Sequence, residues 1–207
     1  MEKTVQFRDF EERDVDFVYR CKNDEKLNSL TVGGFKGLTY EEAIQWVHGC
    51  MGEHPEFKFW AICTNDADRR IVGWVSLSQI NAIEKSAVFY GIVIGDQAYR
   101  NGFAWIEAYL FIYEFVFEHL NFKLLHGSAL ENQISTLTIR EVMFHQVVRI
   151  DKDAVFRNGS FYDVSASVLT SSVYFEHKKN GDYELSAILK RMRQIMKKNK
   201  KKSNIDF

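Results

Sequence analysis

The sequence predicts an α/β domain with a central mixed sheet flanked by helices. Two observations predict this class. Short apolar runs typical of strands alternate along the chain with segments of helical spacing. In addition, 46% of the 207 residues are hydrophobic, and 17 Phe stand against a single Pro, so the chain can build one dense core with few forced breaks.

The first third of the chain contains one strand and two helices. Residues 5–8 are a strand candidate, and residues 12–27 have helical spacing. The pair Gly33-Gly34 marks a loop. Thr39 and Glu42 then fit a capping box, in which the hydroxyl accepts an amide hydrogen and the carboxylate reaches back. We therefore expect a second helix to begin after Thr39.

The middle of the chain predicts three strands, a polar turn and a long helix. Residues 57–63 and 71–80 are strand-like, and residues 88–94 are apolar nearly throughout, as expected for a strand covered on both faces. Residues 95–102 form a polar turn before a helix over 103–120. Three acidic residues are expected on one exposed stripe of that helix: Glu107, Glu114 and Glu118.

The last third predicts a strand, a helix and a hairpin. Residues 123–130 are strand-like, and Asn132 suits the N-cap of a helix over 133–144. Two further strands, 147–156 and 161–169, flank Asn158-Gly159, a strong hairpin signal.

Composition limits the classes of function. Residues from Lys178 onward include ten basic and three acidic residues, a net of +7, which leaves −8 on residues 1–177. The body therefore offers no basic nucleic-acid surface. We expect residues 1–175 to form the domain and residues 176–207 a C-terminal helix with a lysine-rich tail. That tail packs on the body or makes weak contact with an anionic surface.

The cysteines and the apolar segments indicate the compartment. The three cysteines (Cys21, Cys50 and Cys63) form no CxxC pair, so they indicate buried thiols in a reducing environment. No segment fits a signal peptide or a membrane span, and a cytoplasmic protein is expected. The six histidines show no metal-ligand spacing, so no metal is expected.

The turn at 95–102 is the most informative segment. A strand ending in Ile92-Val93-Ile94 leads into Tyr99-Arg100-Asn101-Gly102-Phe103-Ala104, and an apolar helix follows. The first amides of such a helix lack internal partners and lie at the positive end of its dipole. The segment therefore predicts a site for a phosphate or diphosphate.

Four motifs in order resemble the Gcn5-related N-acetyltransferase (GNAT) superfamily. The turn resembles its Q/R-x-x-G-x-G/A pattern, with Tyr99 in the Gln/Arg position, and it follows an acetyl-CoA-type strand. Asn132-x-x-Ser135, followed by Phe144, resembles the family's N-x-x-[AS]…GF segment, and residues 156–164 resemble a closing NGxYxD hairpin. The resemblance is to the branch with ribosomal-protein N-terminal and amino-sugar N-acetyltransferases. It implies a mostly antiparallel sheet.

The resemblance also implies a reaction and its residues. An amine attacks acetyl-CoA directly, with no metal, and a backbone amide at Val93 or Ile94 stabilises the oxyanion. Ser135 protonates the leaving thiolate, since Ile139 stands where the family often has a tyrosine. Asp153 is the expected base, with Asp163 and Glu84 as alternatives. The residues expected to bind the cofactor are Ile92, Val93, Ile94, Tyr99, Arg100, Asn101, Gly102, Phe103, Ala104, Asn132 and Ser135.

Three functions remain open at this point. The first is acetylation of a small-molecule amine such as an amino sugar, and the second is acetylation of a protein N-terminus. The third is a catalytically degenerate protein that binds CoA as a regulatory or interaction module. A monomer or a homodimer is expected.

Overall fold

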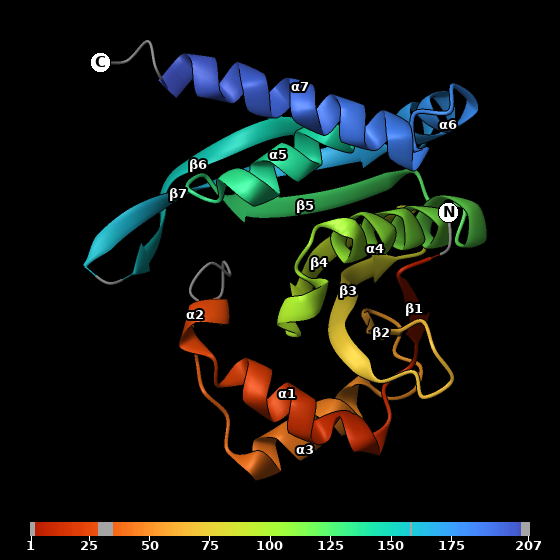
Figure 1. The fold of residues 1–207 in the computed structure, drawn as a ribbon, viewed down its shortest axis with the longest axis vertical. Helices are drawn as coiled ribbons and strands as arrows, with labels where there is room; N and C mark the ends of the chain where they lie inside the picture. The colour runs from red at the N-terminus through yellow and green to blue at the C-terminus, as the bar shows by residue number, and fades with distance from the viewer. Residues whose placement is uncertain (1–2, 29–34, 158, 204–207) are drawn as a thin grey trace. The chain divides into compact units, whose positions relative to one another are not determined.

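The computed structural model describes residues 3–28, 35–157 and 159–203 of the chain. These residues fall into two compact units, Met1–Asn121 and Phe122–Phe207. Figure 1 shows the helices and strands of both. The predicted loop at Gly33-Gly34 lies outside the described residues. The division does not test the predicted domain boundary after residue 175, which stays a prediction.

Unit 1 contains four strands in the order β1-β2-β3-β4, and each neighbouring pair is antiparallel. The strands are β1 (Val5–Arg8), β2 (Lys58–Thr64), β3 (Ile71–Asn81) and β4 (Ser86–Ile94). The helical segments are η1 (Glu12–Asp14), α1 (Val15–Lys22), α2 (Glu25–Asn28), α3 (Tyr40–Cys50), η2 (Gln97–Tyr99), α4 (Phe103–Tyr113) and the π-helix η3 (Glu114–His119).

Helices cover both faces of these four strands. Successive strand residues point to opposite sides of the sheet, so apolar side chains on each side pack against a different set of helices. Ala61 and Trp74 belong to the core under α1 and α3, together with Val18 and Val47. On the other face, Trp60 makes edge contacts with aromatic rings of α4 and η3 at centroid distances of 5.3 and 4.7 Å. Aromatic side chains thus contribute to the packing on both faces of the sheet in unit 1.

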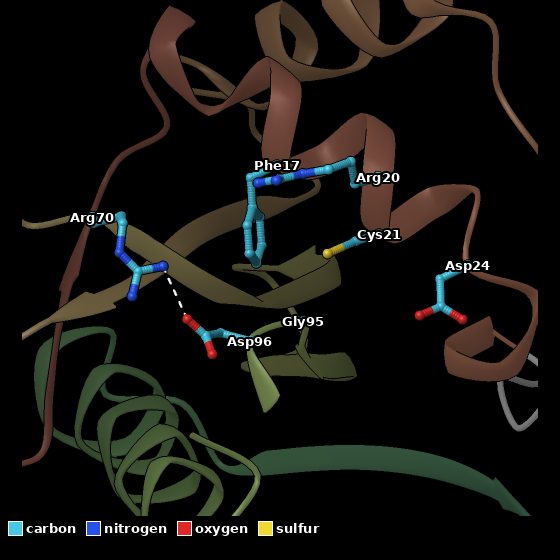
Figure 2. Close-up of a pocket in the computed structure, with 7 residues that line it drawn as sticks. All are labelled: Phe17, Arg20, Cys21, Asp24, Arg70, Gly95 and Asp96. Atoms are coloured by element: carbon cyan, nitrogen blue, oxygen red, sulfur yellow. Dashed lines mark hydrogen bonds and ion pairs between the residues drawn. The ribbon is translucent and has the colours of Figure 1, made fainter. Parts of the chain in front are cut away.

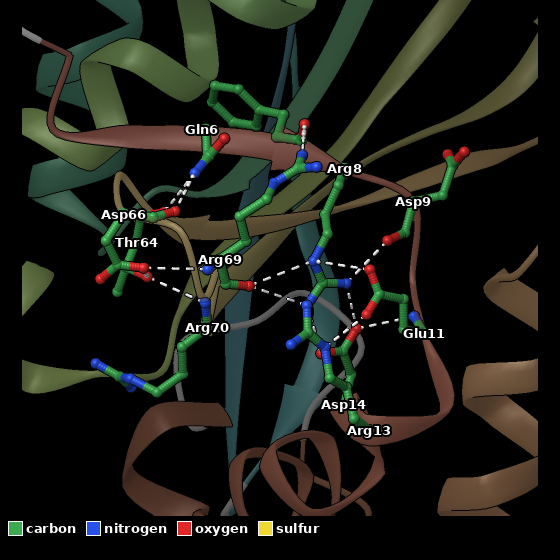
Figure 3. A network of polar contacts seen from close by, with 11 residues as sticks. Gln6, Arg8, Asp9, Glu11, Arg13, Asp14, Thr64, Asp66, Arg69 and Arg70 are labelled. Atoms are coloured by element: carbon green, nitrogen blue, oxygen red, sulfur yellow. Dashed lines mark hydrogen bonds and ion pairs between the residues drawn. The ribbon is translucent and has the colours of Figure 1, made fainter.

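A polar network fixes the start of the chain to the turn between β2 and β3 (Figure 3). Arg8 donates two parallel hydrogen bonds to buried Asp14, at 2.7 and 2.8 Å, and it also reaches the carbonyl of Arg69. The Asp14 carboxylate raises the pKa of Arg8. Such a bidentate pair is directional as well as strong, so it orients the entry to α1.

The helix predicted over 12–27 is wrong as one element, because the chain breaks after Lys22. The Asn23 side chain donates to the carbonyls of Tyr19 and Leu38. Asp24 then accepts the Leu27 N–H and starts α2. Asn and Asp side chains compete with helical backbone bonds in this way. The capping box at Thr39 and Glu42 is confirmed and opens α3.

The helix predicted over 103–120 changes to a π-helix after Tyr113, where the Leu120 N–H donates to Phe115. The predicted stripe of exposed glutamates is wrong for Glu107. This carboxylate is half-buried and accepts the backbone N–H groups of Thr4 and Val5, at 2.8 and 2.9 Å. It therefore attaches the entry to β1 to α4.

Unit 2 contains three antiparallel strands in the order β5-β7-β6. Its elements are β5 (Leu124–Leu130), α5 (Ile134–Val142), β6 (Gln146–Arg157), β7 (Ser160–Thr170), α6 (Ser171–Lys179) and α7 (Leu185–Ser203). Arg157 pairs with Ser160, which confirms the predicted hairpin. The sequence reading missed α6, which Thr170 caps by accepting the Val173 N–H.

The predicted C-terminal helix is confirmed as α7, and its apolar side packs on α5 (Figure 1). Ile188 is fully buried, and Arg191 donates to the carbonyl of Val142 at the end of α5. Lys190 and Arg193 are exposed on the opposite side. The predicted N-cap at Asn132 is wrong, because the helix begins one residue later, with Gln133 at the cap and no capping side chain.

Within the described ranges, no helix has both the length and the apolar character needed to cross a bilayer. The three cysteines are free and buried, as the sequence predicts.

Candidate functional site

The candidate cofactor strand β4 contains an irregularity that the sequence reading missed. Ser76 pairs with Gly91, whereas Leu77 pairs with Phe89, so Tyr90 has no partner on β3 and forms a bulge. The Tyr90 side chain is 67% exposed, which makes the prediction of a strand covered on both faces wrong. Bulges often occur beside active sites, where they re-aim the backbone. Gly91 inside a strand was the available signal.

The turn after β4 is held by its own side chains. Arg100 donates to the carbonyls of Ile94 and Gly95, at 2.9 and 2.8 Å. Asp96 accepts the Ala98 N–H at 3.0 Å and a bond from Arg70 at 2.9 Å. Two donors of Arg100, one of the residues expected to bind the cofactor, stabilise the turn in this way. The turn is therefore pre-formed.

The first turn of α4 presents backbone donors. Gly102 has a φ of 93°, a left-handed conformation that glycine adopts without strain, and a Cβ at this position would meet no atom within 4 Å. Asn101 accepts the Phe103 N–H at 3.1 Å, and the Ile106 N–H donates to Gly102. Within the described part of the chain, the N–H groups of Ala104 and Trp105 have no hydrogen-bond partner. A glycine with open space beside it therefore precedes two backbone donors, an arrangement at which an anion would be stabilised.

A pocket of about 360 Å³ lies beside the start of this turn. Figure 2 shows its lining, which comes from α1, from the segment between α1 and α2, from the residue before β3 and from the residues after β4. The lining residues are Phe17, Arg20, Cys21, Asp24, Arg70, Gly95 and Asp96. Within the described residues, Arg20 makes no hydrogen bond or ion pair. The two arginines lie next to the candidate phosphate turn, where Asp24 and Asp96 balance their formal charge and Arg70 is paired with Asp96.

In unit 2, Ser135 lies in the first turn of α5 with its side chain exposed. Its hydroxyl makes no hydrogen bond within the described residues, so it is not used to cap or bend the helix. Asn132 precedes the helix and is also exposed. Ile139 is buried, as a core residue of α5. A hydroxyl without a structural partner is available for chemistry.

The two candidate carboxylates on the hairpin differ in their surroundings. Asp153 has a positive φ of 51° at an irregularity of β6, and its side chain is exposed without a hydrogen bond among the described residues. Asp163 accepts Lys152 Nζ at 2.6 Å and the Asp153 N–H at 3.0 Å. Lys152 and then this N–H lower the pKa of Asp163. Asp163 thus holds the irregularity in place, which disfavours it as a base.

Glu84, the third candidate base, lies exposed in the turn between β3 and β4, where its N–H donates to Asn81. No hydrogen bond or ion pair joins Ser135 to Asp153 in the parts of unit 2 that are described. The predicted site residues therefore fall into two sets, one around the β4 turn in unit 1 and one on α5 and β6 in unit 2.

A buried polar cluster in unit 2 has no counterpart in the sequence reading. Arg140, on α5, is 9% exposed and donates to the carbonyl of Ser128. His145 is 8% exposed and lies 3.5 Å from the Ser167 hydroxyl. Burial, followed by the charge of Arg140, lowers the pKa of His145 to about 3. The imidazole is therefore neutral at physiological pH.

Among the described residues, no group of three or more His, Cys, Asp or Glu side chains is arranged to hold a metal ion.

Comparisons with known proteins place this geometry in a family. The family model for the acetyltransferase (GNAT) domain matches residues 4–141. A sequence comparison with curated proteins finds no match.

Solved structures share the fold. A spermidine N-acetyltransferase from Vibrio cholerae, in complex with CoA and spermine, is 20% identical with a TM-score of 0.73, over 83% of this chain and 98% of that one. A GNAT-family acetyltransferase from Bacillus anthracis is 15% identical with a TM-score of 0.69, over 83% and 98% of the two chains. A GCN5-related N-acetyltransferase from Brucella melitensis is 15% identical with a TM-score of 0.71, over 89% and 82%.

At these identities the structures show a common α/β fold, and the family model covers two thirds of the chain. Together with the turn before α4, these matches show that the chain belongs to the GNAT acetyltransferase family and is an acetyl-CoA-dependent N-acetyltransferase.

Proposed function

We propose that this enzyme transfers the acetyl group of acetyl-CoA to the primary amine of a small molecule by direct attack of the amine on the thioester. The observation that carries the proposal is the start of α4. A left-handed glycine with open space beside it precedes two backbone donors, at Ala104 and Trp105, that have no partner among the residues the structure describes. This arrangement suits a diphosphate, which the backbone binds regardless of most side chains.

The residues have separate roles in the proposed reaction. A backbone N–H at Val93 or Ile94 stabilises the oxyanion formed when the amine attacks. The Ser135 hydroxyl donates a proton to the departing CoA thiolate. Asp153 takes the proton of the acceptor ammonium, directly or through water. Both side chains are exposed and make no hydrogen bond within the described part of the chain, which supports these assignments.

Charge supports a cationic acceptor. Residues 1–177 carry a net charge of −8, which attracts amines in their protonated form and raises their rate of encounter. The acetyltransferase from Vibrio cholerae is named for spermidine, a small cationic amine. We therefore favour a small cationic amine over a protein N-terminus, and an amino sugar remains a member of this class.

The test is release of CoA from acetyl-CoA in the presence of three acceptor panels: polyamines, amino sugars and peptides with free N-termini. We expect a rate that depends on the small amines and that falls in the Ser135→Ala variant. A rate with peptides alone would favour the protein acceptor. Binding of CoA without an acceptor-dependent rate in any panel would favour the regulatory module and contradict the proposal.

A further inference from the structure

Lys22, the last residue of α1, places its ammonium group against aromatic rings. The Nζ atom lies 4.5 Å from the ring centroid of Trp46 and 5.5 Å from that of Trp74. The two tryptophans come from α3 and β3, and their centroids are 5.6 Å apart. The lysine side chain is half-buried. Lys22, Trp46 and Trp74 thus form a small aromatic site, which we call the lysine cage.

Within the described residues, Lys22 makes no ion pair, and the ionisable groups near it are the thiols of Cys50 and Cys21. Burial raises the pKa of Cys50 to about 12 and that of Cys21 to about 11, so both thiols are neutral at pH 7. Burial accordingly lowers the pKa of Lys22. A larger share of this amine is unprotonated, and therefore nucleophilic, than of an exposed lysine.

The cage lies next to the strand expected to hold the thioester. Trp74 pairs with Val93 across β3 and β4, and Val93 packs against the same core cluster. Neighbouring strands are about 4.8 Å apart. At the end of β4, a Cβ on Gly95 would lie 2.2 Å from Sγ of Cys21, the residue before Lys22. The C-terminal end of α1 is therefore held tightly against the end of β4.

We propose that Lys22 is an acetyl acceptor within its own chain, so that the enzyme acetylates itself at the lysine cage. The inference rests on the proposed use of acetyl-CoA at β4. In this step the Nζ lone pair of the neutral amine attacks the thioester carbonyl, and an N–C bond forms as the C–S bond breaks. The proton lost from nitrogen passes through water to the CoA thiolate. The products are an acetamide at Lys22 and free CoA thiol.

The test incubates the purified full chain with acetyl-CoA and follows intact mass, then locates the modification by peptide mapping. We expect one acetyl group at Lys22, formed at a rate that is independent of protein concentration, as an intramolecular step requires. Lys22→Arg keeps the cation in the cage and should lose this modification. Lys36→Arg changes an exposed lysine and should leave it unchanged.

A further variant separates catalysed from chemical acetylation. Gly102→Glu blocks the candidate diphosphate site, so it should abolish acetylation of Lys22. Acetylation at an equal rate in Gly102→Glu, or equally at many lysines, would overturn the proposal. Binding of acetyl-CoA detected by thermal shift without any acetyl-Lys22 would also overturn it, while leaving the proposed function intact. Absence of both would reject the proposed function and this inference together.

Discussion

The two units of the chain supply the candidate chemistry in different ways. Around the β4 turn of unit 1, the charged side chains of Arg100 and Asp96 are engaged within the turn. Among the described residues, the backbone donors at Ala104 and Trp105 have no partner. On α5 and β6 of unit 2, the side chains of Ser135 and Asp153 are exposed and make no hydrogen bond with the residues that the structure describes. One unit offers backbone groups to a ligand, and the other offers side chains.

This difference explains why the turn departs from the family pattern without losing its geometry. A site made of backbone N–H groups requires only a particular backbone conformation, and few side chains are needed to specify that conformation. At Gly102 the positive φ is such a requirement, whereas Tyr99 is not fixed by it. A site made of side chains tolerates fewer substitutions, because its chemistry requires the particular atoms of those side chains. The following predictions test this contrast, beginning with the largest expected effect.

Ser135→Ala should reduce the acetyl-transfer rate by about a hundredfold, or about 2.7 kcal/mol of activation free energy, because it removes a proton donor. The affinity for acetyl-CoA and the melting temperature should stay unchanged, since the hydroxyl has no structural partner. Steady-state kinetics with the best amine and a CoA titration measure the two effects. A wild-type rate in the Ser135→Ala enzyme would contradict the proposal that this side chain of unit 2 takes part in the chemistry.

Gly73→Ala should destabilise unit 1 by about 2 kcal/mol, because a Cβ there would lie 2.2 Å from the Val93 carbonyl oxygen. Gly91→Ala is the matched control on β4, where a Cβ would meet nothing within 4 Å. Denaturant unfolding of both variants measures the difference. Equal stabilities would mean that β3 and β4 do not approach as closely as the geometry requires.

The free energy of unfolding should fall as the pH is lowered below about 6.5, because the pKa of buried His145 is about 3 in the folded chain and 6.5 when unperturbed. The unfolded chain therefore takes up a proton that the folded chain excludes. Stability from this group is complete above pH 6.5 and is lost at up to about 1.4 kcal/mol per pH unit below it. His145→Gln should have the shallower slope, and parallel slopes would argue against a buried neutral imidazole.

The two hairpin carboxylates should separate into one structural and one catalytic group. Asp163→Asn should lower the melting temperature slightly, because it weakens the bonds from Lys152 and the Asp153 N–H. The folded pKa of Asp163 is lowered, so its stabilisation is present above pH 3.8 and disappears as the pH falls further. The difference from wild type should therefore vanish in acid.

Asp153→Asn, by contrast, should lower the transfer rate and leave the melting temperature unchanged at every pH. Rate loss in Asp163→Asn alone would reverse the assignment of the base.

Much of the fold could be predicted from local patterns. Capping at Thr39, the hairpin of β6 and β7 and the apolar face of α7 depend on neighbours within a few residues, and the structure confirms them. Some errors arose where a nearby polar side chain, such as Asn23, competes with the helical backbone. Others arose from contacts with residues far away in the sequence. Glu107 is held by the backbone of Thr4 and Val5, more than a hundred residues away, which no helical periodicity reveals.

In the candidate site, too, the locally determined features could be predicted from the sequence and those set by distant contacts could not. The turn before α4 could be predicted because a glycine followed by an apolar helix specifies it locally. The bulge at Tyr90 could not, because it depends on the register between β3 and β4. The lysine cage joins α1, α3 and β3. Its character arises from burial and from neighbouring thiols in place of a carboxylate among the described residues, neither of which the sequence encodes locally.

The most direct test of the central claim is a thermal shift measured with acetyl-CoA, free CoA and ATP on the wild type, Gly102→Glu and Tyr99→Ala. A ligand that binds only the folded chain raises the melting temperature. We predict a shift with acetyl-CoA and CoA, but not with ATP, in the wild type and in Tyr99→Ala, and its loss in Gly102→Glu. A shift retained in Gly102→Glu, or lost in Tyr99→Ala, would contradict a cofactor site built from the backbone of this turn.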